Sequence, residues 1–319
     1  MWVYGHTSGA VAVEALKRFS GIVLSEASLW RCVEQWGQPI QADEQLRQTS
    51  ANALPLRGDA GPTALHSSHN MGVAMDGTMV HIRKEGWKEL KVGCVFDVEV
   101  RRETMPASDD LEDRAHAVNT SYLGVLGSAD AFGRRLWTEA VRRRVPQAHD
   151  SIVIGDGAHW IWDLAQEHFG SSWQVVDWYH AKQHLHGVAD LAFGEGSATG
   201  QQWVKSMRTP LYQGQVWQVT ASIQELAAEY PTAAKSLLTE AGYFKTNQRR
   251  MQYLEVRDAG LPIGSGMVES GCKRFGARFD GAGMRWSRAG AERLIPIRAA
   301  ILSGHFDEVW HAALNSPRN

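Results

Sequence analysis

Two aspartates stand at the ends of short apolar runs, and each is followed by glycine. The run "MGVAMDG" leads to Asp76, and "SIVIGDG" leads to Asp156. Runs of this length and composition are typical of strands, and open sheets gather their sites at the carboxyl ends of strands. Two carboxylates held side by side repel each other unless a cation lies between them, and Mg²⁺ takes such oxygen ligands while it keeps waters for a phosphate substrate. An Asp-Gly pair alone is also a common turn, so the prediction depends on further residues.

A third carboxylate, Glu269, lies in the stretch "GSGMVESGCKRFGARFDGAGMRW". Lys273 follows it at the i+4 position of a predicted helix, so one interpretation is a surface ion pair worth about 0.3–0.5 kcal/mol. In the other interpretation Glu269 joins Asp76 and Asp156 in a site for two divalent ions. Three acids are enough for such a site, because DNA and water complete both coordination shells.

Basic residues are concentrated directly after Glu269. From Lys273 to Arg298 the chain carries seven cations and two acids, a local charge of +5 in a chain whose formal net charge is -2. A DNA backbone would explain this concentration through counterion release, whereas a solvated helix face is the alternative. Trp286 could stack on an unpaired base, although we favour a core position for it. The candidate DNA contacts are Lys273, Arg274, Arg278, Arg285, Trp286 and Arg288.

The stretch "DWYHAKQHLH" contains a competing signal. His180 and His184 lie four residues apart on one predicted helix face with Asp177 near them, which is a possible zinc arrangement. The stretch lacks the glutamate of an HExxH motif and any cysteine partner. We therefore favour a structural role, in which Asp177 and His180 hydrogen-bond to each other and brace the helix that leaves the sheet beside Asp156.

The elements that must position these residues follow from periodicity. Strand patterns end at Asp76, cover 90–100 and 121–127, and precede Asp156 and Asp177, with helical patterns after the third, fourth and fifth strands. The order β-β-β-α-β-α-β-α predicts an α/β fold with a mixed five-stranded sheet flanked by helices. Residues 181–262 have a helical period throughout and are predicted to form an all-helical insertion after the fifth strand.

The ends of the chain complete the domain prediction. Residues 1–48 form a helical N-terminal region whose outline fits a helix-turn-helix, although Glu26 and Glu34 against Arg31 fit a plain packing unit at least as well. Residues 49–70 are rich in turn formers and predict a linker. The sheet domain comprises residues 71–180 and the closing helices of residues 263–304, and residues 305–319 are expected to be a tail.

Composition excludes several classes of protein. The content of 44% hydrophobic and 21% charged residues is ordinary for a soluble globular chain. Three widely separated cysteines without a CxxC pair indicate neither a disulfide framework nor a thiolate zinc site, which fits a reducing cytoplasm. No run approaches the ~18 apolar residues of a membrane span, and the N-terminus lacks the pattern of a signal peptide.

Taken together, these motifs resemble a known family. The strand order, "MDGT", "IGDGAHWIW", "VVDWYH", the helical insertion and "GSGMVESGCK" look like bacterial insertion-sequence transposases of the RNase H-like DDE class, of the Kra type and related to the Mutator-like group. The resemblance covers about residues 71–304. It implies that Asp76, Asp156 and Glu269 form the metal-binding triad, and that Asp177 and His180 match an Asp-x-x-His motif of related families.

The resemblance also implies a function. We expect metal-dependent DNA cleavage with two Mg²⁺ or Mn²⁺ ions, followed by strand transfer through the freed 3′-hydroxyl. The expected partners are element-end inverted repeats and target DNA, bound by a homo-oligomer at the bacterial nucleoid. The region before Asp76 is short for such an enzyme, so a DNA-binding domain is expected to be missing or to lie outside this chain. The alternatives are a nuclease of the same fold and a truncated or domesticated DNA-binding protein.

Overall fold

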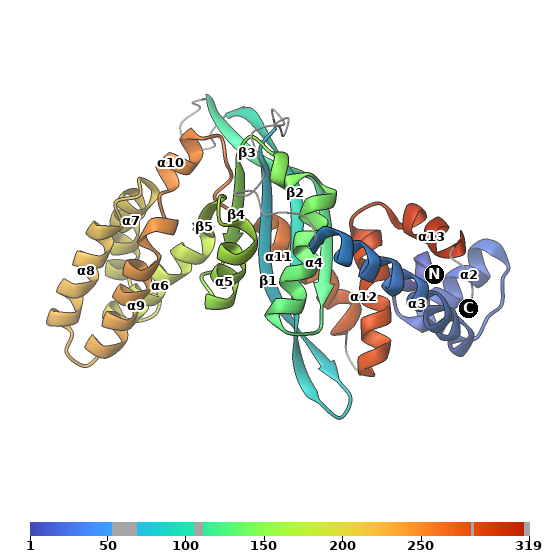
Figure 1. Cartoon of the computed structure of the whole chain (residues 1–319). Coiled ribbons are helices and arrows are strands. Elements are labelled where there is room, and N and C mark those ends of the chain that lie inside the picture. The colour runs from blue at the N-terminus through green and yellow to red at the C-terminus, as the bar shows by residue number, and fades with distance from the viewer. Residues whose placement is uncertain (53–68, 105–110, 282–283, 316–319) are drawn as a thin grey trace.

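The computed structural model describes residues 1–52, 69–104, 111–281 and 284–315, and a five-stranded mixed sheet lies at its centre (Figure 1). The strand order is β3-β2-β1-β4-β5. The strands are β1 (Met71–Ile82), β2 (Gly86–Thr104), β3 (Leu111–Val125), β4 (Ser151–Gly155) and β5 (Trp173–Val176). β2 pairs antiparallel with both β1 and β3, whereas β4 pairs parallel with both β1 and β5. The predicted α/β fold is confirmed, and this topology is consistent with an RNase H-like core.

β1 and β2 are longer than their apolar patterns predicted. β1 does not end at Asp76 but continues to Ile82, and a tight turn with Lys84 and Gly86 at positive φ leads into β2. The continuation is strand because Val80 and Ile82 are fully buried while their neighbours are not. Asp76 therefore lies in mid-strand, but it still lies beyond the parallel pairing with β4, which ends at Ala74.

Helices cover both faces of the sheet. Two glycines on neighbouring strands mark the two faces, because side chains at their positions would point to opposite sides of the sheet. A side chain at Gly93 of β2 would contact Phe132 of α4. A side chain at Gly124 of β3 would contact Ile295 of α12 and Phe275 of α11. One layer thus contains α4 (Ala129–Arg142), with α5 (His159–Phe169) beside β4, and the other contains α11 (Gly266–Phe279) and α12 (Arg288–Leu302).

The chain between β5 and α11 is helical, as predicted. It consists of α6 (Trp178–Phe193), α7 (Ala198–Tyr212), α8 (Val216–Glu229), α9 (Ala234–Asn247) and α10 (Tyr253–Asp258), and no strand occurs between residues 181 and 260, all of which the structure describes. These helices form a bundle on one side of the sheet (Figure 1). Buried Tyr253 anchors α10 to the sheet, because its hydroxyl donates to the carbonyl of Val176 at 3.0 Å.

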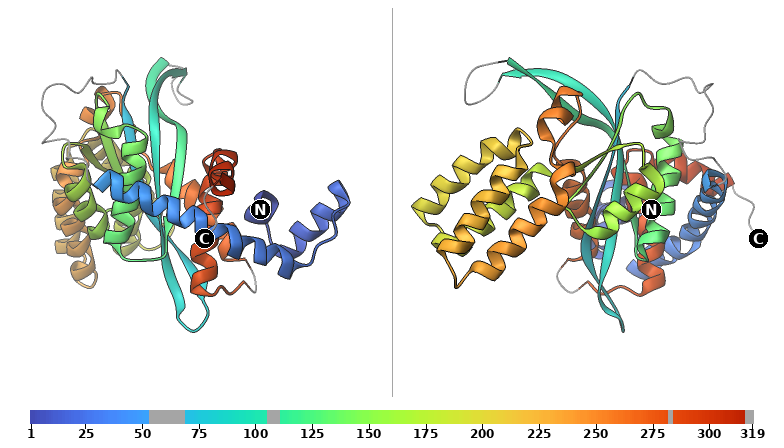
Figure 2. Two further views of the ribbon diagram at one scale, coloured as in Figure 1. Left: turned by 45° about the vertical axis from the view of Figure 1, so that its right-hand side comes forward. Right: turned by 60° about the vertical axis from the view of Figure 1, so that its left-hand side comes forward.

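The N-terminal helices lie together with the last two helices on the other side of the sheet (Figures 1 and 2). α1 (Trp2–His6), α2 (Gly9–Ser20) and α3 (Glu26–Asn52) lie beside α12 and α13 (Phe306–Asn315). α3 continues past the predicted helical region of residues 1–48 into the predicted linker, of which residues 53–68 lie outside the described residues. The expected tail is instead α13 as far as Asn315, because Trp310 packs on Trp36 with ring centroids 5.0 Å apart.

Candidate active site

Three aspartates form one row across adjacent strands. The parallel register pairs Ala74 with Ile154, so two residues further on Asp76 comes level with Asp156. The register between β4 and β5 pairs Gly155 with Val176, so one residue further on Asp156 comes level with Asp177. The row lies at the carboxyl edge of the parallel strands, which is where the sequence placed the two Asp-Gly carboxylates.

Asp76 lies at the centre of the acidic site. Its Oδ1 accepts a hydrogen bond from the amide of Gly77 at 2.7 Å, and its carboxylate also has a hydrogen bond with the thiol of Cys272 on α11. Burial raises the pKa of Asp76, the two hydrogen bonds oppose this increase, and the charges of Asp156 and Glu269 raise the pKa further. Asp156 and Glu269 are thus each close enough to Asp76 for their charges to act on its carboxyl.

Glu269 lies in the first turn of α11. The hydroxyl of Ser265, at the N-cap position, donates to its Oε1 at 3.4 Å. Within the described part of the chain, no ion pair joins Glu269 to Lys273, whose side chain is exposed. The surface ion pair is therefore absent here, and Glu269 contributes to the electrostatic environment of Asp76 instead.

Asp177 connects two helices. It is 1% exposed and caps α6, where its Oδ1 accepts from the backbone amide of His180 at 2.6 Å. Its Oδ2 accepts from the backbone amide of Ser265 at 2.5 Å. These contacts support the predicted bracing role but correct its partner: Asp177 binds the main chain of His180, not its imidazole. The brace holds the start of α11, and with it Glu269, against β5.

The histidines make other contacts. His184 Nδ1 lies 2.7 Å from Glu240 Oε2, and its ring stacks on Tyr243 with centroids 3.6 Å apart. Tyr243, from the helical insertion, donates its hydroxyl to the carbonyl of Asp156 at 3.2 Å. Nothing in these contacts supports the zinc alternative.

Metal-binding capacity can be judged from the donors. No group of three or more His, Cys, Asp or Glu side chains that could hold an ion occurs among the described residues. A Mg²⁺ site requires fewer protein ligands than this, because the ion binds through one or two carboxylates and takes its other ligands from water and substrate phosphates. Asp76, Asp156 and Glu269 offer only oxygen donors, and the charges of the other two act on Asp76, which fits such ions.

Arg278 requires a correction. It is 2% exposed, its Nε donates to the carbonyl of Tyr4 at 3.0 Å, and its guanidinium lies 4.9 Å from the ring centroids of both Tyr4 and Trp286. The prediction that Arg278 contacts DNA is therefore wrong for this structure: the residue lies on the inner face of α11 and holds the N-terminal helices. Trp286 is half-buried and donates to the carbonyl of Phe279 at 2.9 Å, which agrees with the favoured core position.

The remaining candidate cations divide into two groups. Arg288 pairs with Glu85 and, at 3.4 Å, with Glu292, so much of its charge is neutralised within the protein. Lys273, Arg274 and Arg285 are exposed. These three remain the candidates for phosphate contacts from the predicted set.

Three residues of the site were missed by sequence reasoning. Ser265 could have been predicted from the sequence, because it lies at the start of a predicted helix and four residues before Glu269. Cys272 had a sequence signal too, since it lies three residues after Glu269 on the same helix face. Tyr243 had none, because it reaches Asp156 from the helical insertion.

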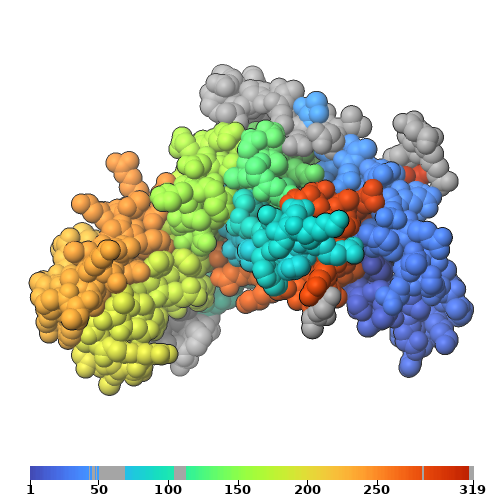
Figure 3. Space-filling view, turned by 90° about the horizontal axis from the view of Figure 1, so that it is seen from below, coloured from blue at the N-terminus to red at the C-terminus, as the bar shows by residue number. Residues whose placement is uncertain are grey.

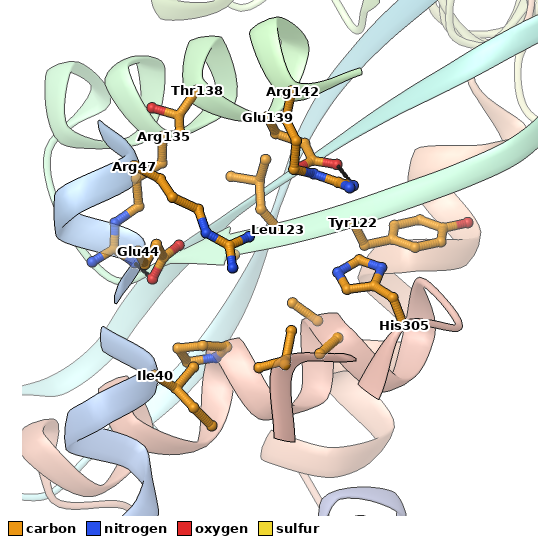
Figure 4. Close-up of a pocket in the computed structure, with 15 residues that line it drawn as sticks. Ile40, Glu44, Arg47, Tyr122, Leu123, Arg135, Thr138, Glu139, Arg142 and His305 are labelled. Carbon is orange, nitrogen blue, oxygen red and sulfur yellow. Dashed lines mark hydrogen bonds and ion pairs between the residues drawn. The ribbon is translucent and has the colours of Figure 1, made fainter. Parts of the chain in front are cut away.

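A separate cavity of about 100 Å³ lies between α3, α4, α12 and β3 (Figure 4). Its charged lining is paired internally: Arg135 lies 3.3 Å from Glu44, and Arg142 lies 2.6 Å from Glu139. β3 is the edge strand and is separated from β1 by β2, so this cavity is not part of the acidic site.

Comparison with known proteins gives a distant relative. No protein-family model matches the sequence. A protein of Streptococcus gallolyticus named UPF0236 protein in vanSb 3'region is 26% identical over 141 residues. The match covers 44% of this chain and 30% of that protein, so the chain spans about a third of its relative's length. That name states no activity.

Proposed function

We propose that this protein is the catalytic core of a DNA transposase, which cleaves a DNA strand at the end of a mobile element and joins the freed 3′-hydroxyl to target DNA. The observation that carries the proposal is the convergence of Asp76, Asp156 and Glu269, from a central strand, the end of its parallel neighbour and a helix beyond the insertion. The family resemblance of the motifs points to the same chemistry.

The acids would hold two Mg²⁺ or Mn²⁺ ions between them. When bound, such a pair of ions supplies activation of the attacking water or 3′-hydroxyl and stabilisation of the leaving oxygen. The role of Asp76, Asp156 and Glu269 is to present carboxylate oxygens from fixed backbone positions. Asp177 and Ser265 act through Glu269 by fixing the start of α11, and Tyr243 holds the backbone at Asp156.

Partners and location belong to the same proposal. Lys273, Arg274 and Arg285 would bind phosphates of element-end and target DNA, with a homo-oligomer assembled on the DNA at the bacterial nucleoid. Among the described residues, every helix is too short or too polar to cross a lipid bilayer.

Substitution of the acids tests the proposal. Glu269→Gln, Asp76→Asn and Asp156→Asn should each lower Mg²⁺-dependent cleavage of an element-end duplex by several orders of magnitude while DNA binding persists. A double substitution should be scarcely worse than a single one, because each carboxylate belongs to the same clamp. Lys273→Ala, which removes one proposed phosphate contact and no acid, should keep Mg²⁺-dependent cleavage at saturating DNA. Near wild-type cleavage by Glu269→Gln would contradict the triad, and exposed Asp163 and Glu167 would be tested next.

The same assay separates the alternatives. A transposase yields products in which the element end is joined to target DNA, whereas a nuclease of this fold yields nicked or cut DNA only. A DNA-binding protein derived from a transposase would bind the duplex with no metal-dependent product from wild type.

A further inference from the structure

The hairpin of β1 and β2 projects beyond the acidic edge of the sheet (Figure 1). Its turn begins after Ile82, six residues past Asp76, which corresponds to about 20 Å of strand. Viewed from that side, the hairpin tip stands out towards the viewer at the centre of the face, next to the segment around residues 275–300 (Figure 3). The hairpin extends past the pairings with β4 and β3, which end at Ala74 and Lys91, so its length requires another explanation.

The tip is held rigidly. Val80 and Ile82 are fully buried on one side of the hairpin. The amide of Arg83 donates to the carbonyl of Trp286 at 2.8 Å, and the amide of Trp286 donates to the carbonyl of His81 at 3.2 Å. Arg288 also pairs with Glu85 in the turn. The hairpin is therefore docked along its edge against the segment that follows α11.

The uncovered surface of the tip has a distinctive composition. Trp87 is 55% exposed and Met79 is 46% exposed, although both sit in strands whose other side is buried. The two acids nearby are already neutralised, since Glu85 pairs with Arg288 and Glu89 with Lys91. In contrast, four cations around the tip form no ion pair with any described residue: Arg83, Lys84, Lys88 and Arg285.

Unpaired cations beside an exposed indole match the two chemical features of DNA. Lysine and arginine bind the phosphates with release of counterions, and an aromatic ring stacks on any base that is unpaired. A two-stranded ribbon is also narrow enough for the major groove, which is about 12 Å wide. The tip lies beyond the same end of the sheet as the acids, although Met79 and Trp87 point to the face opposite Asp76, because side chains alternate along a strand.

We propose that residues Ile82–Lys88 form a DNA-binding finger, in which Arg83, Lys84 and Lys88 contact phosphates and Trp87 stacks on a base. This inference rests on the proposed function, because it assumes that DNA is the substrate of the acidic site. It adds a contact set outside the predicted basic stretch. At 3.4 Å per base pair, a duplex lying along the hairpin would be contacted about six base pairs from the cleaved bond.

Two sets of variants test the finger, with matched controls from the helical insertion. Arg83→Ala/Lys84→Ala/Lys88→Ala removes three cations, and Lys205→Ala/Arg208→Ala/Lys235→Ala removes three exposed cations elsewhere. Trp87→Ala removes the exposed indole, and Trp217→Ala removes another that is 63% exposed. Binding is measured by fluorescence anisotropy with a labelled duplex and its single strand over a range of salt concentrations. Cleavage is measured with Mg²⁺ at saturating DNA.

The finger variants should bind less tightly than wild type, whereas the controls should not. Three lost phosphate contacts reduce the slope of log affinity against log salt by about 2.7, and Trp87→Ala weakens single-strand binding by about 5- to 150-fold, with rescue by Trp87→Phe. Cleavage at saturating DNA should persist in these variants, which distinguishes them from the acid variants.

Unchanged affinity and salt slope in both finger variants would overturn the finger while leaving the proposed function intact, provided that wild type cleaves. An equal loss in the control variants would also overturn it, because binding would then depend on overall charge. If wild type binds no DNA and instead binds anionic vesicles through Trp87, both the finger and the proposed function fail.

Discussion

At the scale of single residues, the ionised carboxylate of Asp76 destabilises the folded chain. Asp76 is held where burial, Asp156 and Glu269 all raise its pKa, so its ionised form is disfavoured in the folded chain. Carboxyls with a raised pKa at the carboxyl edge of a sheet are typical of functional sites.

The raised pKa of Asp76 predicts a pH-dependent stability difference. Without metal, the contribution of Asp76 is fully present below the ordinary pKa of 3.8 and is lost as the pH rises through the higher folded pKa. Asp76→Asn should therefore unfold at higher denaturant than wild type at neutral pH, by on the order of 1 kcal/mol or less, and the difference should vanish in acid. Asp163→Asn is the exposed control. A variant that is less stable than wild type at neutral pH would contradict this prediction.

At the scale of elements, short contacts between helix ends position the site. Asp177 joins the first turn of α6 to the first turn of α11, and Arg278 joins α11 to α1 through the carbonyl of Tyr4. Arg298 extends this second connection, since its guanidinium donates to the carbonyl of Gly5 at 3.2 Å. The N-terminal helices are thus attached to the helix that carries Glu269.

The brace at Asp177 gives a prediction that separates it from His180. Asp177→Ala removes the cap of α6 and leaves the buried amide of Ser265 without its acceptor, so it should lower the free energy of unfolding by about 2–4 kcal/mol. It should also lower cleavage, because Glu269 loses its support. His180→Ala keeps the backbone amide and should cost less than about 1 kcal/mol. Equal losses in the two variants, measured by urea denaturation, would show that the imidazole takes part in the brace.

At the scale of the whole molecule, the sheet lies between two helical parts: the insertion on the β5 side and the N-terminal helices with α13 on the other (Figure 1). The acidic edge receives residues from three regions that are distant in sequence, since Tyr243 comes from the insertion and Cys272 from α11. Ligands that bind this edge should therefore stabilise the molecule as a unit.

Metal binding should be visible as a shift in thermal unfolding. At about 100 times its Kd, one bound ion adds about 2.7 kcal/mol to the stability of the folded state. Addition of Mg²⁺ or Mn²⁺ should raise the Tm of wild type by several degrees in differential scanning calorimetry, and Asp156→Asn and Glu269→Gln should lose most of this rise. Asp163→Asn, exposed on α5, should keep it. The same rise in Glu269→Gln would remove that residue from the proposed ligands.

The sequence by itself determined the order of the elements and the positions of the acids along them. Alternating and continuous apolar runs report burial directly, because side chains in a strand point to alternate faces and the core excludes charge. Five strands, an all-helical insertion and the placement of Asp156 and Asp177 at strand ends follow from such local patterns. The alignment of Asp76, Asp156 and Asp177 in one row could be established only from the strand register.

Only the tertiary structure decided which charges face outward. Arg274 and Arg278 lie four residues apart on α11, yet one is exposed and the other is buried against Tyr4. No local pattern distinguishes them, because burial of an arginine depends on a carbonyl and two aromatic rings supplied by segments far away in the chain. The end of β1 also depends on a distant segment: in addition to its pairing with β2, the backbone at His81 and Arg83 hydrogen-bonds to Trp286.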